Sequence, residues 1–112
     1  MEFDVAEIAG GATKIVLRGR FDTTAAVLIE MPFNSALADK KAVIVDLSAI
    51  DFLSSYGVRV LLMGAKMMAG KGRKLVIMCP DNNVGKVLRT AGIGDVVPVL
   101  PNEQAALAAV TA

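Results

Sequence analysis

Histidine is absent from this sequence. That absence excludes Ser-His-Asp and Cys-His catalysis, and it removes the commonest general base and the most frequent zinc ligand. Cys79 is the only cysteine, so no intrachain disulfide can form, which favours a reducing compartment. These absences exclude several classes of enzyme, and we expect neither a metal site nor a cofactor.

Aromatic residues are also scarce, at 4% of a chain that is 54% hydrophobic, so the core must be aliphatic. The formal net charge is +1 without a run of like charges, which gives no electrostatic case for nucleic acid or an anionic membrane. No apolar stretch approaches the roughly 18–20 residues that cross a bilayer. The acidic N-terminus lacks the apolar segment of a signal peptide. We expect a soluble, cytoplasmic protein without direct membrane insertion.

The 112 residues suit a single domain over 1–112, without repeats or linkers. Hydrophobic periodicity predicts strands at 3–8, 13–18, 41–46, 74–78 and 96–99, and helices at 22–38, 55–69, 81–90 and 102–110. The run at 41–46 is apolar and β-branched, which is typical of a central strand covered on both faces. Pro32 should kink the first helix or split it into two. This order predicts an α/β domain with a mixed sheet.

The most informative segment is 43–62, which predicts a buried strand, a sharp polar turn and a helix that begins at Ser54 and Ser55. A serine at an exposed helix start can accept a phosphate, because backbone N–H groups and the helix dipole favour negative charge there. The alternative is that one serine caps the helix and the other only packs nearby. The residues alone leave both interpretations open.

Four segments, in order, resemble the STAS domain family, the fold of bacterial anti-sigma factor antagonists. They are GRFD at 19–22, VDLS at 45–48, FLSSYGVRVLL at 52–62 and VLRTAGI at 87–93. The resemblance covers nearly the whole chain. It implies the STAS fold, a mixed β-sheet of about five strands with helices packed mainly on one face.

The resemblance also implies a function in a partner-switching cascade that regulates transcription. It makes Ser55 the serine that a GHKL-type anti-sigma factor kinase phosphorylates and that a PP2C-type phosphatase restores. The unphosphorylated form binds the kinase and releases the sigma factor. Phosphorylation adds about −1.5 to −2 charges to the contact surface and breaks the complex. Two positions depart from the family pattern, because Ser54 replaces a frequent Asp and Tyr56 replaces a small residue.

Several side chains are candidates for the partner-binding surface. We expect the helix to face the sheet with Val58, Leu61, Leu62, Ala65 and Ala69, which leaves other apolar side chains off that stripe. The candidates are Asp22, Ser54, Ser55, Tyr56, Arg59, Met63 and Met67. Exposed Met and Tyr are frequent at protein contacts, although a neighbouring helix could equally cover them. Asp22 has a second interpretation as a helix N-cap, and Tyr56 as a core residue.

Other readings stay open. The chain could be a STAS accessory subunit of a transport or lipid-trafficking complex, or a partner-switching relay whose output is secretion or motility. A hydrolase with Ser55 as nucleophile has little support without histidine. A homodimer is compatible with the sequence. Asp46 and Asp51 could suggest paired carboxylates, but we expect Asp46 to end a strand and Asp51 to lie in a loop, so they do not predict a metal site. The Gly-Lys-rich segment 70–74 follows a helix, whereas a P-loop precedes one.

Overall fold

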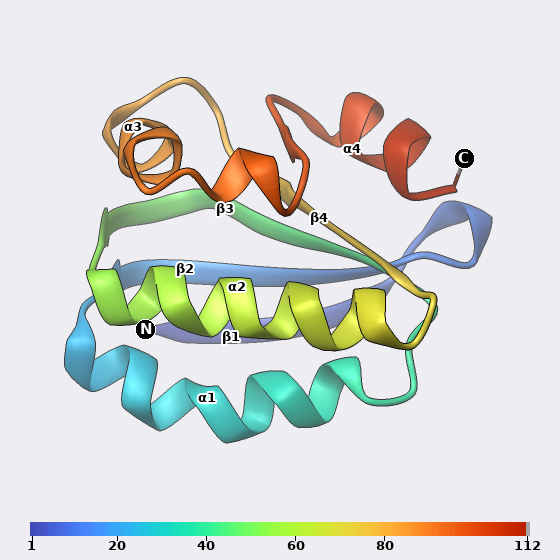
Figure 1. The fold of residues 1–112 in the computed structure, drawn as a ribbon, viewed down its shortest axis with the longest axis horizontal. Helices are drawn as coiled ribbons and strands as arrows, with labels where there is room; N and C mark the ends of the chain where they lie inside the picture. Colours follow the sequence, from blue (N-terminus) through green and yellow to red (C-terminus); the bar gives the residue numbers. More distant parts are fainter. Residues whose placement is uncertain (112) are drawn as a thin grey trace.

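A five-stranded sheet forms the centre of the fold, and its strands lie in the order of the sequence (Figure 1). In this computed structural model, which describes residues 1–111, the strands are β1 (Glu2–Glu7), β2 (Thr13–Phe21), β3 (Ala42–Leu53), β4 (Lys74–Met78) and β5 (Val99–Leu100). β1 runs antiparallel to β2, and every other neighbouring pair is parallel. The predicted mixed sheet is therefore confirmed.

Four α-helices connect or follow these strands: α1 (Thr23–Leu37), α2 (Ser55–Gly70), α3 (Asn83–Thr90) and α4 (Glu103–Thr111). Short 3₁₀ turns occupy Ala9–Gly11 and Ile93–Asp95. Buried residues of α1, α2 and α3 belong to one core cluster, whereas α4 packs against β3 and β4 in a second, smaller cluster. Helices thus lie mainly on one face of the sheet, as predicted.

β3 is covered on both faces, which explains its continuous aliphatic sequence. Val43, Val45 and Leu47 belong to the larger core, whereas Ile44 packs in the smaller cluster with Val110 of α4. All of these side chains are at most 2% exposed.

The predicted polar turn after residue 46 is wrong, because β3 continues to Leu53. The polar residues of this part keep the strand conformation since β2 also extends, to Phe21, and pairs with β3 up to the contact between Phe21 and Leu53. The pairing of β2 with β3 has two register irregularities, at Val16/Arg18 and Gly19/Arg20. They interrupt the alternation of buried and exposed side chains by which a strand is predicted from its sequence. The last strand is also shifted, from the predicted 96–99 to Val99–Leu100, because the N–H groups of Val96 and Val97 donate to the carbonyl oxygen of Ile93 in the preceding turn.

Pro32 does not split α1, which is a single helix from Thr23 to Leu37. Both halves of α1 are held by buried residues, with Ala26 and Ile29 before the proline and Phe33 and Leu37 after it. Packing on both sides of an exposed proline therefore overrides the local preference for a break.

The face that α2 buries differs from the predicted stripe. Its buried residues are Gly57, Val60, Leu61, Gly64, Ala65 and Met68, whereas Val58 and Leu62 are half-buried and Ala69 is exposed. The two glycines explain the rotation. A Cβ at Gly64 would lie 2.8 Å from Phe33 Cε2 and 2.9 Å from Leu37 Cδ1, so α1 and α2 approach each other closely at this glycine. Hydrophobic periodicity does not detect such a contact, because glycine has no side chain.

Candidate functional site

The carboxyl ends of β2, β3 and β4 meet at one edge of the sheet, where α/β folds usually carry their functional residues. The starts of α1 and α2 lie close together there (Figure 1). The backbone N–H of Ser54 donates a hydrogen bond to the carbonyl oxygen of Phe21 at 2.9 Å, which joins the two strand ends. The serine turn is therefore anchored to β2 as well as to its own helix.

The two adjacent serines have different positions in this turn. Ser54 is the N-cap of α2, and its Oγ accepts a hydrogen bond from the backbone N–H of Gly57 at 3.0 Å. Ser55 is the first helical residue and is exposed. The predicted cap is thus Ser54, and the hydroxyl of Ser55 is left at the surface of the helix start.

Asp22 lies at the neighbouring helix start and caps α1, because its Oδ1 accepts a hydrogen bond from the N–H of Ala25 at 2.9 Å. Its other carboxylate oxygen lies 3.6 Å from Nε of Arg20. The same guanidinium lies over the ring of Phe52, 4.0 Å from its centroid. Sequence reasoning did not single out Arg20, since its contact with Phe52 arises from the pairing of these two residues across β2 and β3.

A hollow of about 590 Å³ opens beside Ser55, between the start of α2 and helix α3. Its walls are mostly apolar, and the residues that line it are Leu53, Ser55, Val58, Asn83, Lys86, Val87, Thr90 and Ala91. The sequence does not indicate the contribution of α3. The segment 87–93 resembles a family motif, but nothing in its pattern places it against the serine turn.

Tyr56 points away from this hollow and toward α1. Its hydroxyl donates a hydrogen bond to Oε1 of Glu30 at 2.9 Å, and this bond and the charge of the carboxylate raise the pKa of Tyr56. The neighbouring helix therefore partly covers Tyr56, and Met67 is likewise half-buried against the core. Met63 is 49% exposed and Arg59 is exposed, so these two of the predicted contact residues are free on the surface of α2.

The surface of α1 carries apolar side chains that sequence reasoning overlooked. Val27, Leu28 and Met31 are 54%, 73% and 79% exposed. A signal for them was present, because Glu30 is the only charged residue between Thr23 and Leu37 and its carboxylate is engaged by Tyr56.

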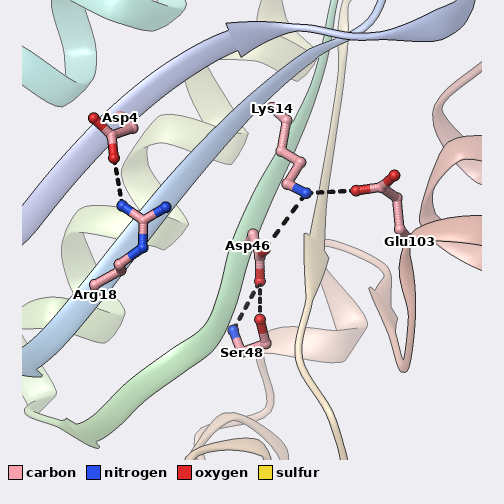
Figure 2. A network of polar contacts seen from close by, with 6 residues as sticks. All are labelled: Asp4, Lys14, Arg18, Asp46, Ser48 and Glu103. Carbon is pink, nitrogen blue, oxygen red and sulfur yellow. Dashed lines mark hydrogen bonds and ion pairs between the residues drawn. The ribbon is translucent and has the colours of Figure 1, made fainter.

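The carboxylate of Asp46 lies on the opposite face of the sheet from the helices α1 and α2 and serves a structural network. Its Oδ1 accepts hydrogen bonds from the N–H and the Oγ of Ser48 at 2.8 and 2.6 Å. Figure 2 shows Lys14 between Asp46 and Glu103 of α4. Over residues 1–111, no group of three or more His, Cys, Asp or Glu side chains is arranged to hold a metal ion.

The structure is an α/β domain with an exposed serine and an apolar hollow at the carboxyl edge of its sheet. Comparison with known families identifies it: a model of the STAS domain matches residues 5–106, so the chain belongs to the STAS domain family. In the part of the chain that the structure describes, no helix is both long and apolar enough to span a bilayer.

One sequence relative and two solved structures illustrate this similarity. The chain is 29% identical over 75 residues to the anti-sigma-F factor antagonist RsfA of Mycobacterium tuberculosis, a match that spans 67% of this chain and 59% of RsfA. Its fold is similar to the crystal structure of an anti-sigma factor antagonist from Mycobacterium paratuberculosis, with a TM-score of 0.91, 24% identity and coverage of 99% and 94% of the two chains. The phosphorylated form of the Bacillus cell fate determinant SpoIIAA matches with a TM-score of 0.71, 20% identity and coverage of 97% and 99%.

Proposed function

We propose that this protein is an anti-sigma factor antagonist that works by partner switching in the cytoplasm, and that Ser55 is its switch. The observation that carries the proposal is the division of roles at the start of α2. Ser54 supplies the cap, so the hydroxyl of Ser55 is exposed, is not needed for the helix, and borders an apolar hollow.

The modification is a phosphoryl transfer from ATP bound to a GHKL-type kinase. A bond forms between Ser55 Oγ and the γ-phosphorus, and the bond from that phosphorus to the β,γ-bridging oxygen breaks. ADP leaves with the electron pair, and the hydroxyl proton passes to a base of the kinase. A PP2C-type phosphatase reverses the state by hydrolysis with water, so the protein is a substrate of both enzymes and has no catalytic role of its own.

The unphosphorylated protein binds the kinase, itself an anti-sigma factor, through the surface around Ser55. The exposed side chains of Arg59 and Met63 lie on the same helix, and the exposed apolar residues of α1 begin close to the same edge. A phosphate in such a contact surface introduces about −1.5 to −2 charges, which must be desolvated or repelled on binding. Phosphorylation therefore ends the complex without a change of fold.

Intact-mass measurement after incubation with the kinase and ATP tests the site. We expect one added phosphate on the wild type and on Ser35→Ala, which removes another exposed serine, and none on Ser55→Ala. Phosphorylation of Ser55→Ala would place the switch elsewhere. Absence of phosphate from the wild type, with every GHKL-type kinase of the source organism, would indicate constitutive docking and overturn the proposal.

The charge mechanism has a separate test in kinase binding by calorimetry. Ser55→Asp should weaken binding by about tenfold or more, because a charge is buried at the contact without a partner. Ser35→Asp places the same charge on α1 and should leave the affinity close to that of the wild type. Equal affinities for Ser55→Asp and the wild type would contradict the mechanism.

A further inference from the structure

Lys86 of α3 faces the same hollow as Ser55 of α2. Among residues 1–111 it is the only charged residue that lines the hollow, and none of them places a carboxylate there. The other polar lining groups on α3 are the side chains of Asn83 and Thr90, which offer an amide and a hydroxyl. The wall opposite Ser55 therefore presents a cation and hydrogen-bonding groups on an otherwise apolar surface.

The neighbouring cations are already engaged, whereas Lys86 is not. Arg89, also on α3, lies 3.1 Å from a carboxylate oxygen of Asp81, and Arg20 is held by Asp22 and Phe52. For the residues that the structure describes, Lys86 takes part in none of the ion pairs or side-chain hydrogen bonds. Its ammonium is thus free to bind an anion that enters the hollow.

Arg59 is the other cation near the serine, four residues along α2. Residues four positions apart share a helix face, so Arg59 is the cation that could compete with Lys86 for the phosphate. Its positive charge also partly offsets the rise that Glu30 causes in the pKa of Tyr56. Arg59 does not line the hollow.

We propose that the phosphate on phosphorylated Ser55 is held within the molecule by Lys86, which pairs with it across the hollow. The inference rests on the proposed function and specifies which group of the protein binds the phosphate. The phosphate then fills the entrance of the apolar hollow and ties α3 to the start of α2. Phosphorylation removes a binding groove as well as adding charge.

The proposal predicts a measurable effect on the phosphate itself. A phosphoserine loses its second proton at about pH 6, and a nearby cation favours the dianion and lowers that pKa. Other charged groups stand on the elements around the hollow, and all of them are common to wild type and Lys86→Met: Arg20, Asp22, Asp51, Arg59, Asp81 and Arg89. The dipole of α2 also acts equally in both, so a difference between them reports on Lys86.

Phosphorus NMR titration of protein with phosphoserine incorporated at position 55 during translation is the test. We expect the second pKa of the phosphate to be about 0.5 pH unit higher in Lys86→Met than in the wild type. Lys66→Met removes an exposed lysine of α2 outside the hollow and should titrate like the wild type. Lys86→Arg should restore most of the wild-type value, because it keeps the charge.

Two results would overturn the proposal: equal titration of wild type and Lys86→Met, or a larger shift for Arg59→Met than for Lys86→Met. Lys86 is exposed, so loss of its charge leaves the core intact, and circular dichroism checks the fold of each variant. No kinase enters this experiment. A failure of the kinase to modify Ser55 would refute the proposed function, whereas a failure of the titration would refute only the role of Lys86.

Discussion

At the scale of single residues, the site depends on two serines with the same side chain and different surroundings. The Oγ of Ser54 is committed to the N–H of Gly57, and that of Ser55 is exposed. A serine at an N-cap satisfies a backbone donor that the helix cannot, whereas the next position has no such duty. The helix cap and the proposed phosphorylation site are thus adjacent residues, and we expect that each can be changed without the other.

Substitution of the two serines should separate these duties. Ser54→Ala should lower the free energy of unfolding by about 1 kcal/mol, since it removes the cap of α2. Ser55→Ala should change it by less than about 0.5 kcal/mol. Urea denaturation of the unphosphorylated proteins measures both, and equal losses would show that Ser55 shares the structural role.

The sequence could indicate this site only in part. The two serines after an aromatic residue, with the surrounding family motifs, predict Ser55 as the modified residue, and this stays a prediction. The hydrogen bond of Tyr56 to Glu30 joins residues 26 positions apart, and the hollow depends on α3, so neither has a local pattern. Such contacts follow from the packing of whole helices and become visible only in three dimensions.

At the scale of elements, glycine determines how α1 and α2 pack. Gly57 and Gly64 lie seven residues apart on the buried face of α2. A Cβ at Gly57 would lie 2.9 Å from Leu53 Cδ1, and one at Gly64 would meet Phe33 and Leu37 of α1. The helix is thus seated closely on the strand ends and on its neighbour, which fixes the direction of its first turn.

Gly64→Ala should therefore destabilise the protein by about 1–3 kcal/mol, although alanine is the better helix former. Gly70→Ala is the matched control at the end of the same helix, where a new Cβ meets nothing within 4 Å. It should leave the stability unchanged or raise it by up to about 1 kcal/mol. Thermal unfolding distinguishes the two, and a neutral Gly64→Ala would show that Phe33 and Leu37 can move aside.

The sequence predicted which segments form helices and strands better than it predicted the residues at which they begin and end. Apolar runs and the helical period located every strand and α-helix. The polar residues Ser48 and Asp51 suggested a turn within what is the second half of β3, because the partner strand that keeps them extended is distant in sequence. The buried face of α2 was misjudged for a related reason, since a glycine adds nothing to a hydrophobic pattern even where it marks the closest contact.

At the scale of the whole molecule, polar contacts join the sheet to helix α4 on the face opposite α1 and α2. Lys14 of β2 lies between Asp46 of β3, at 3.8 Å, and Glu103 at the start of α4 (Figure 2). Asp46 is 6% exposed, and this lysine and Ser48 are the polar partners of its carboxylate. The C-terminal helix is thereby connected to the strand that leads to the serine turn.

Lys14→Met should lower the free energy of unfolding by about 1–3 kcal/mol, because it leaves the buried carboxylate without its cation. Adding Asp46→Asn should recover part of this loss, since the double variant has no unpaired charge. Arg89→Met removes an exposed ion pair with Asp81, away from Asp46, and should have little effect. Denaturant titration compares the three, and equal effects of Lys14→Met and Arg89→Met would contradict the network.

The two outer strands of the sheet have a consequence for solubility. β1 exposes three carboxylates, from Glu2, Asp4 and Glu7, and β5 has only two residues, between Pro98 and Pro101. Acidic side chains repel a like strand, and proline cannot donate a backbone hydrogen bond to one, so neither edge offers a template for cross-β growth. The exposed apolar side chains of α1 thus belong to a molecule whose sheet edges resist aggregation.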